Sequence, residues 1–305
     1  MDKIIITTGD PNGIGAEITM KALKALNLPK EKIAIISNKK ILNYYGKLDK
    51  NYEIIEIPYT ENDIKVGQVT KEAGEFSFQS LKLACELKPK AIVTAPVAKN
   101  ALHLAGHNFN GQTEVLQHFL AHDNQLAEML FVANGFRVLL LTRHCALKEI
   151  TLTQDVVVTK IKNLVKTFQK QFGINNPKFA LCGFNPHSGE DGILGREEID
   201  ILIPAVQELQ NAGIDITMPL PADTLFVDAA KNYLKNTKDK YDCYIANYHD
   251  QGLIPIKTVA GENTVNMTIG LDIVRTSPGH GTAFDIAGKN IASPNGMIAA
   301  IKEVL

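Results

Sequence analysis

The 305-residue sequence lacks several features that would assign a protein to a class outright. It has no tryptophan, and its four cysteines, Cys85, Cys145, Cys182 and Cys243, have the spacing of neither a zinc knuckle nor a disulfide framework. We therefore expect reduced and mostly buried thiols. No apolar run approaches the length of a membrane span, and the first residues carry an acid where a signal peptide carries cations. These absences predict a cytoplasmic protein with no membrane partner.

An excess of one sign of charge is also missing. Lysine and arginine total 32 against 33 aspartate and glutamate residues, and no basic block is long enough to follow a phosphate backbone. Nucleic acid is therefore not an expected partner. Apolar residues make up 45% of the chain, which is ample for one large or two medium hydrophobic cores.

Short, continuously apolar runs alternate with amphipathic segments along the chain. A sheet covered on both faces produces such runs, and the segments between them are long enough for crossover helices. The sequence therefore predicts an α/β fold with a mostly parallel sheet. The expected strands are residues 3–8, 33–37, 91–95, 136–142, 179–183 and 243–247, and the expected helices are residues 16–26, 72–86, 156–172 and 196–210. The stretch YHDQGLIPIK after the last expected strand contains Gly252, which predicts a break in regular secondary structure.

Three of the expected strands lead into histidine. His144, His187 and His249 each follow an apolar run. Ligands of open α/β sheets bind beyond the carboxyl ends of the strands, so these imidazoles should meet at one edge. Three neutral imidazoles, with Asp223 and Asp250 available to orient them or complete the shell, suit a divalent metal that keeps an open position. A loop or hydrogen-bonded core histidine at each position is the competing interpretation.

The first expected strand ends in TTGDPNGIGAEI. Gly9, Gly13 and Gly15 let the backbone turn tightly before a helix, so the segment can present backbone amides to an anion. The pattern is neither the dinucleotide-binding fingerprint nor a Walker loop. A turn shaped only by packing explains it equally well.

The stretch HGTAFDIAGK lies near the C-terminus. It is similar to a loop of the isocitrate and isopropylmalate dehydrogenases, which lack the dinucleotide-binding fingerprint. That resemblance implies a wrap around the adenosine end of NAD. The residues it assigns to the cofactor are His280, Gly281, Thr282, Ala283 and Asp285.

Eight blocks run in order over nearly the whole chain: TTGDPNGIGAEI, AIVTAPVAKNAL, GQTEVL, LTRHCALKEI, GFNPHSGEDGILGREE, PADTLF, YHDQGLIPIK and VNMTIGLDIVRTSPGHGTAFDIAGKN. Together they resemble the 4-hydroxythreonine-4-phosphate dehydrogenase family. The resemblance implies NAD-dependent oxidation and decarboxylation of 4-phosphohydroxy-L-threonine to 3-amino-2-oxopropyl phosphate, in pyridoxal phosphate biosynthesis. It also implies a homodimer with shared active sites.

The same resemblance assigns roles to individual residues. His144, His187 and His249 are implied ligands of a divalent metal, such as zinc, cobalt or magnesium. Asp223, Asp250 and Lys257 are implied to support catalysis. The implied ligands of the phosphorylated substrate are Gln112, Thr113, Lys257, Asn266 and Arg275, of which the two cations would hold its phosphate and carboxylate ends. One block departs from the family, because Gln112 stands where a histidine is usual.

The resemblance also predicts two α/β domains around a cleft, as in the isocitrate and isopropylmalate dehydrogenases. Residues 1–130 and 255–305 would form the cofactor domain, and residues 131–254 would carry metal, substrate and dimer contacts. Two other functions stay open. A related dehydrogenase of a phosphorylated threonate or another hydroxy acid would keep the metal and NAD blocks. A metal-dependent phosphate-binding or acyl-phosphate transfer protein would share the α/β shape, although the NAD-like loop argues against it.

Overall fold

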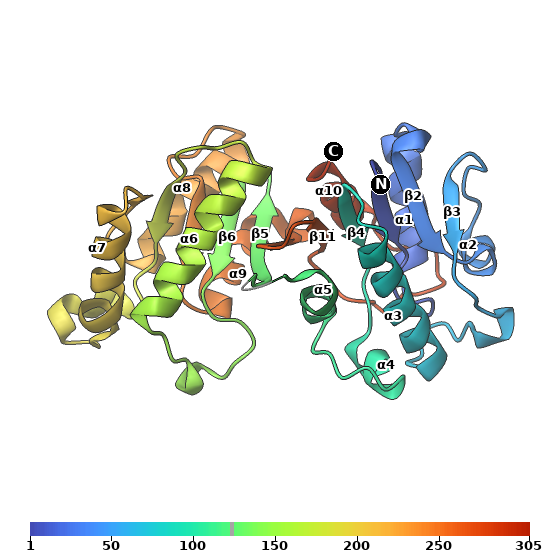
Figure 1. The fold of residues 1–305 in the computed structure, drawn as a ribbon, viewed down its shortest axis with the longest axis horizontal. Helices are drawn as coiled ribbons and strands as arrows, with labels where there is room; N and C mark the ends of the chain where they lie inside the picture. The colour runs from blue at the N-terminus through green and yellow to red at the C-terminus, as the bar shows by residue number, and fades with distance from the viewer. Residues whose placement is uncertain (123–124) are drawn as a thin grey trace. The chain divides into compact units, whose positions relative to one another are not determined.

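The computed structural model describes residues 1–122 and 125–305, which form two compact units. The terminal unit comprises residues 1–127 and 265–305, and the central unit comprises residues 128–264. Each unit has a sheet with helices on both faces (Figure 1). A domain boundary at residue 254, as the sequence suggested, would fall inside helix α9 (His249–Ala260), whereas the division between the units follows that helix.

The sheet of the terminal unit has the strand order β3-β2-β1-β4-β11-β10. Its strands are β1 (Ile4–Thr7), β2 (Ile33–Ser37), β3 (Glu53–Glu56), β4 (Ala91–Thr94), β10 (Val265–Ile269) and β11 (Val274–Pro278). All neighbouring pairs are parallel except β10 with β11. The three central strands β1, β2 and β4 are buried along their whole length. Their continuous apolar sequences follow from this burial on both faces.

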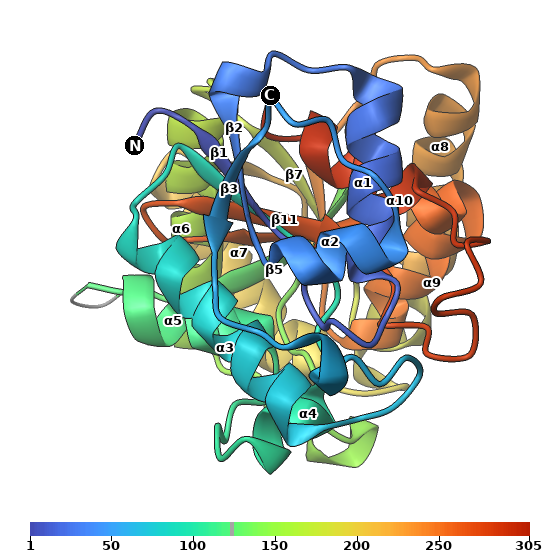
Figure 2. The ribbon, with the colours of Figure 1, turned by 90° about the vertical axis from the view of Figure 1, so that its right-hand side faces the viewer.

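Helices cover both faces of this sheet. Alternate residues of β1 enter different cores: Ile4 and Ile6 pack in one cluster and Ile5 in another. The first cluster includes α1 (Gly15–Leu26) and α10 (Asn295–Lys302), which lie side by side (Figure 2). The second cluster includes α2 (Lys39–Tyr45), α3 (Lys71–Glu86) and α5 (Gln112–Leu120), and α4 (Lys99–Leu104) packs on α3.

The sheet of the central unit has the order β5-β6-β9-β7-β8. Its strands are β5 (Glu128–Ala133), β6 (Phe136–Leu140), β7 (Lys178–Leu181), β8 (Asp215–Ile216) and β9 (Cys243–Ala246). The β5–β6 hairpin is antiparallel and the other pairs are parallel. Helices α6 (Gln154–Gln171) and α7 (Ile203–Asn211) contact each other, as do α8 (Ala222–Lys235) and α9. The last two pack on Phe136, Val138 and Tyr244 in one apolar core.

Shorter helical turns connect these elements. They are η1 (Lys30–Lys32), η2 (Glu61–Asp63), η3 (Leu147–Glu149), η4 (Pro186–Gly192), the π-helical η5 (Glu198–Leu202) and η6 (Gly261–Asn263). No helix in the described chain is both long and apolar enough to span a membrane. Cys85, Cys182 and Cys243 are buried as expected, whereas Cys145 is exposed.

The predicted α/β class with a mostly parallel sheet is confirmed. The expectation of a break at Gly252 is wrong, because this glycine is buried inside α9. A Cβ at that position would lie 2.6 Å from Leu140 Cδ2 and 2.9 Å from Val138 Cγ1. Glycine therefore lets α9 pack closely on β6, and the helix continues through it.

Candidate active site

A cavity of about 300 Å³ in the central unit lies where β6 and β9 end. His144 comes from the loop after β6, and His249 is the first residue of α9, just beyond β9. Because β6 and β9 are parallel neighbours, their carboxyl ends bring the two side chains together. The centroids of the two imidazole rings are 5.5 Å apart. Two of the three predicted histidines therefore meet at the expected edge of the sheet.

The side chain of His249 is oriented by its neighbour. Its Nδ1 lies 2.7 Å from Oδ1 of Asp250, which leaves Nε2 for another partner. Arg143 lines the same cavity, and its Nη1 is buried with no hydrogen-bond partner among the described residues. The cavity thus combines two imidazoles, a carboxylate and a guanidinium with an unused donor.

The other two predicted residues of this shell lie outside that cavity. His187 is exposed on η4, where residues 187–191 have φ angles between 45° and 83°, and Asp223 is exposed in the first turn of α8. In the described part of the chain, no three or more His, Cys, Asp or Glu side chains are grouped to hold a metal ion. The His144–His249 pair has a suitable separation, since two imidazoles on one zinc ion would have ring centres about 5 Å apart.

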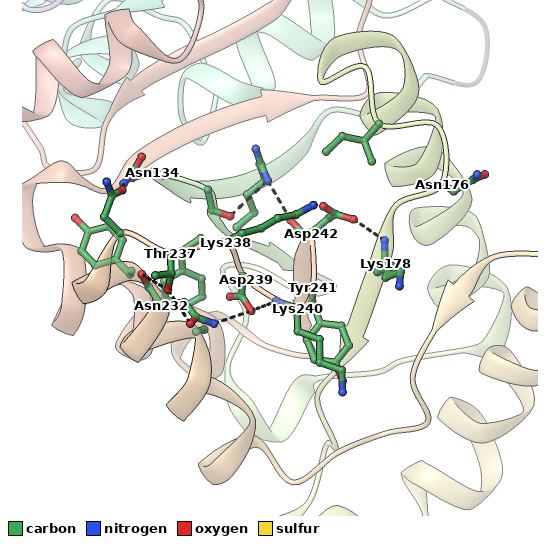
Figure 3. A pocket seen from close by; sticks show the side chains of 17 residues that line it. Asn134, Asn176, Lys178, Asn232, Thr237, Lys238, Asp239, Lys240, Tyr241 and Asp242 are labelled. Atoms are coloured by element: carbon green, nitrogen blue, oxygen red, sulfur yellow. Dashed lines mark hydrogen bonds between the residues drawn. The ribbon is translucent and has the colours of Figure 1, made fainter.

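A larger cavity of about 600 Å³ opens at the opposite edge of the same sheet (Figure 3). Its lining includes Arg137 near the start of β6, Lys178 at the start of β7, and Asp242 just before β9. These are the amino ends of the strands, whereas ligands of open α/β sheets bind at the carboxyl ends. This cavity is therefore separate from the predicted site.

Arg275 is a buried cation in the terminal unit. Its residue surface is 2% exposed, its Nε donates to Thr94 Oγ1 at 2.8 Å, and its Nη1 donates to Thr268 Oγ1 at 3.4 Å. Burial lowers the pKa of the guanidinium to about 9, with Glu114 acting in the opposite direction, so the group remains charged at neutral pH. It forms no ion pair with any described residue. A buried guanidinium held only by hydroxyl groups is suited to binding an anion.

Other predicted substrate ligands of this unit lie on α5 and β10. Gln112 and Thr113 begin α5, and Gln112 Nε2 donates to the carbonyl oxygen of Ala95 at 3.2 Å. Because that carbonyl can only accept, the amide oxygen of Gln112 faces elsewhere, and it is buried without a described partner. Asn266 on β10 also has a buried, unpartnered Oδ1. In the central unit, Lys257 is exposed in the last turn of α9.

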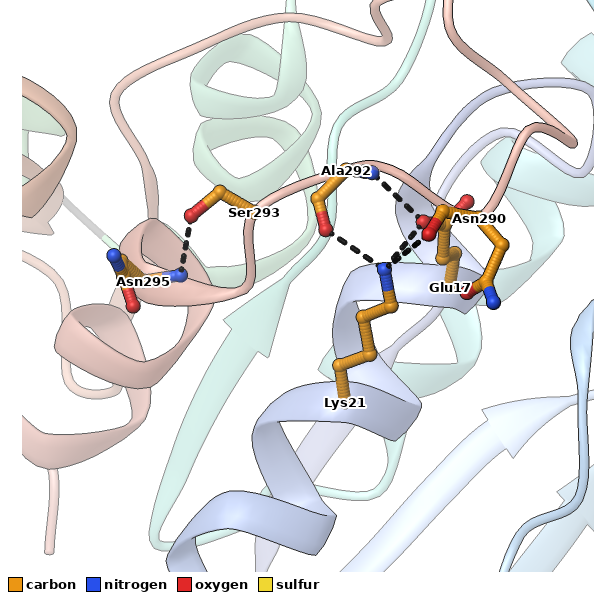
Figure 4. A network of polar contacts seen from close by, with 6 residues as sticks. All are labelled: Glu17, Lys21, Asn290, Ala292, Ser293 and Asn295. Atoms are coloured by element: carbon orange, nitrogen blue, oxygen red, sulfur yellow. Dashed lines mark hydrogen bonds and ion pairs between the residues drawn. The ribbon is translucent and has the colours of Figure 1, made fainter.

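The connecting segment, residues 279–294, joins β11 to α10 without a helix or strand. Two of its residues, Asn290 and Ala292, are held by Glu17 and Lys21 of α1 (Figure 4). Its predicted cofactor ligands His280, Gly281 and Asp285 are exposed. The Asp285 carboxylate makes no hydrogen bond or ion pair with the described residues, so it is available to the ribose hydroxyls of a dinucleotide. The segment therefore has groups that fit NAD.

The family model described as "Pyridoxal phosphate biosynthetic protein PdxA" matches residues 3–304. The chain belongs to this family. A relative from Synechocystis sp. named 4-hydroxythreonine-4-phosphate dehydrogenase is 40% identical, with 99% of this chain and 94% of that protein covered. A second relative, named D-threonate 4-phosphate dehydrogenase, comes from Salmonella typhimurium. It is 37% identical, with 98% of this chain and 97% of that protein covered. PdxA-family relatives of this chain thus carry two substrate names.

Solved structures support the fold of this PdxA-family chain. A 4-hydroxythreonine-4-phosphate dehydrogenase from Klebsiella pneumoniae has a TM-score of 0.86 and 33% identity, with 100% of this chain and 98% of that chain covered. A β-decarboxylating dehydrogenase from Thermococcus kodakarensis has a TM-score of 0.53 at 15% identity, over 98% of this chain and 81% of that chain. The latter shares the fold alone, which agrees with the predicted class.

Asp10 is a buried carboxyl group of this PdxA-family chain that sequence reasoning overlooked. It is 0% exposed, its Oδ1 accepts a hydrogen bond from Asn12 N at 2.9 Å, and its Oδ2 has no described partner. Burial raises its pKa to about 6, although the backbone N–H groups of Asn12 and Ala98 act in the opposite direction. The sequence does carry a signal for it, because in TTGDPNGIG an acid closely follows an apolar strand at the edge where ligands of α/β sheets bind.

Proposed function

We propose that this chain catalyses NAD-dependent oxidation and decarboxylation of 4-phosphohydroxy-L-threonine to 3-amino-2-oxopropyl phosphate. The observation that carries the proposal is Arg275, a buried guanidinium that forms no ion pair with the described residues, in a chain whose PdxA-family relatives act on phosphorylated substrates by name. The match of the family model over residues 3–304 supports the proposal.

Arg275 is the proposed anchor for an anionic end of the substrate. Thr94 and Thr268 hold its Nε and Nη1, and Nη2 makes no hydrogen bond with the described residues. A charged hydrogen bond to a phosphate or carboxylate oxygen contributes about 1.5–3 kcal/mol. Gln112, Thr113, Lys257 and Asn266 are the other proposed substrate ligands.

The proposed oxidation moves a hydride from the hydroxyl-bearing carbon of the substrate to NAD⁺, while the hydroxyl proton passes to a base. Asp250 is the proposed base, and Asp223 supports it. The β-keto acid then loses carbon dioxide, and the carbon left behind takes a proton, for which Lys257 is the proposed donor. The balance is one NADH and one carbon dioxide per substrate. His280, Gly281, Thr282, Ala283 and Asp285 are the proposed cofactor ligands.

A divalent metal is proposed at His144, His187 and His249, where it would lower the pKa of the substrate hydroxyl and stabilise negative charge on oxygen. The 5.5 Å spacing of the His144 and His249 rings supports two of these ligands. Chelator should abolish activity and added metal should restore it. Full activity of metal-free protein would reject the metal.

The chemistry can be tested with purified protein, NAD, a divalent metal and 4-phosphohydroxy-L-threonine. NADH and carbon dioxide should appear in equal amounts. A failure to bind NADH would instead favour a phosphate-binding or acyl-phosphate transfer protein. The expected cytoplasmic location and the homodimer with shared active sites stay predictions.

D-threonate 4-phosphate is the second candidate substrate. Two observations favour it: a relative with this name is 37% identical over nearly the whole chain, and Gln112 replaces the histidine usual in the dehydrogenase family that the sequence resembles. The first substrate carries an amine where D-threonate 4-phosphate carries a hydroxyl group. The rates of NADH formation on the two compounds therefore distinguish the two candidate functions.

A further inference from the structure

The N-cap residue of α1, Ile14, and the helix itself hold the connecting segment at two places. At one, the backbone N–H of Ile14 donates to the carbonyl oxygen of Thr282 at 3.1 Å. A Cβ on Gly13 would lie 2.9 Å from that same oxygen, so glycine permits the close approach. At the other, Glu17 and Lys21 bind the backbone of Asn290 and Ala292 (Figure 4). Residues 283–289 thus form a loop with both ends attached to one helix.

At the second place, all three N–H donors of the Lys21 ammonium group are occupied. Its Nζ donates to Glu17 Oε1 at 2.8 Å, to the carbonyl oxygen of Ala292 at 3.0 Å and to that of Asn290 at 3.1 Å. An ammonium group has three donors, so these contacts leave none for a ligand. The role of Lys21 is therefore to hold the segment rather than to bind a phosphate itself.

Glu17 completes the attachment. Its residue surface is 2% exposed, and its Oε1 accepts from Ala292 N at 2.9 Å as well as from Lys21. It lies in the first turn of α1, where the helix dipole favours a carboxylate. A buried carboxylate is costly without its cation, so the two side chains act as a unit.

We infer that Glu17 and Lys21 are positioning residues for the nicotinamide cofactor. The inference rests on the proposed function, in which residues 280–285 bind NAD. Apart from turns such as Ile286 N to Ala283 O, the loop has no regular structure of its own. Ordering a free loop on binding weakens affinity, whereas a loop already held in place binds without that loss. The contacts of Glu17 and Lys21 should therefore set cofactor affinity without touching the cofactor.

The test is a fluorescence titration with NADH, for which a chain without tryptophan gives little protein background. Lys21→Ala should weaken NADH binding about tenfold, roughly the contribution of one net charged hydrogen bond. Lys21→Arg keeps donors to the same carbonyls and should stay within about twofold of wild type. Lys24→Ala is the matched control, because Lys24 is exposed on the same helix and makes no ion pair with the described residues.

Two further readouts separate positioning from general stability. In cofactor-free protein, hydrogen exchange of residues 280–292 should speed up in Lys21→Ala and not in Lys24→Ala. In turnover, Lys21→Ala should raise KM for NAD and leave KM for the phosphorylated substrate within about twofold. Should Lys21→Ala fail to fold, Lys21→Gln, which keeps a donor at the side-chain end, takes its place.

The outcomes distinguish the inference from the function on which it rests. If wild type binds no NADH, the proposed dehydrogenase function fails. If wild type binds NADH and the Lys21 variants bind it equally well, with unchanged exchange in the segment, the positioning role of Glu17 and Lys21 is wrong.

Discussion

Arg275 carries its charge inside the terminal unit with only hydroxyl groups for partners. We predict that Arg275→Met keeps or raises the melting temperature, because it removes a buried charge that forms no ion pair with a described residue. The same change should lower kcat/KM for the phosphorylated substrate by about 100-fold or more, through loss of charged hydrogen bonds. Thermal melts and initial rates measure both effects. Exposed Arg196 provides a control, and an Arg275→Met protein as active as Arg196→Met would contradict the assignment.

Asp10 should make stability depend on pH. Burial raises its pKa from 3.8 to about 6, so the folded state binds the proton more tightly than the unfolded state. Ionisation of Asp10 therefore destabilises the fold progressively as pH rises from about 4 to about 6. Above that range the whole destabilisation is present. Asp10→Asn keeps an acceptor for Asn12 N and removes the charge.

We predict that Asp10→Asn gains up to about 3 kcal/mol over wild type near pH 8 and little near pH 4. Urea unfolding at both pH values measures the difference. An equal effect at both would mean that Asp10 is not titrating in this range.

Gln112 is the residue at which this chain leaves the pattern of its family. If it contacts the substrate phosphate, Gln112→Ala should raise KM about fivefold with little change in kcat, since a neutral hydrogen bond contributes about 1 kcal/mol. Gln112→His should be neutral or improving on 4-phosphohydroxy-L-threonine. A histidine variant that gains on this substrate and loses on D-threonate 4-phosphate would instead assign Gln112 to a different specificity.

At the scale of elements, α9 depends on Gly252. We predict that Gly252→Ala destabilises the protein by about 1–2 kcal/mol, because overpacking against Leu140 and Val138 outweighs the better helix propensity of alanine. Thr258→Ala, on an exposed position of the same helix, is the control and should stay within about 0.5 kcal/mol of wild type. Denaturant unfolding compares the two. A Gly252→Ala protein that is more stable than wild type would show that α9 can move away from β6.

Each strand that the sequence predicted has a continuous apolar run. Residues 33–37 match β2 in full, and β4 and β9 each end one residue before the predicted strand. Two of the strands that were missed have mixed sequences: β3 reads EIIE and is partly exposed, and β11 reads VRTSP and includes buried Arg275. Their pairing is decided by neighbouring strands rather than by local pattern.

Helix prediction failed where tertiary packing overrides local propensity. The α9 helix contains Gly252 and Pro255, both of which disfavour a helix interior, and it forms because Leu253 and Ile256 enter the core of the central unit. The same limit applies to the candidate site. His144 and His249 were predictable as neighbours, because both follow parallel strands. The place of His187 depends on the left-handed backbone of η4, which no sequence pattern indicated.

At the scale of the whole molecule, the family resemblance predicts more about domain organisation and function than the hydrophobic periodicity does. Composition and pattern predicted an α/β class, but a unit assembled from residues 1–127 and 265–305 leaves no linker to read. Sequence blocks spread over the chain resemble the 4-hydroxythreonine-4-phosphate dehydrogenase family, and the PdxA family model covers residues 3–304. Family membership does not decide the substrate, since relatives with different substrate names have similar sequence identity to this chain.

The most direct test of the proposed function is kcat/KM for NADH formation on two substrates, 4-phosphohydroxy-L-threonine and D-threonate 4-phosphate, with NAD and a divalent metal supplied. We predict a preference of at least about tenfold for 4-phosphohydroxy-L-threonine, the difference expected from roughly one well-placed polar contact to its amine. A wild-type protein that prefers D-threonate 4-phosphate, or that forms NADH from neither compound, would contradict the proposed function.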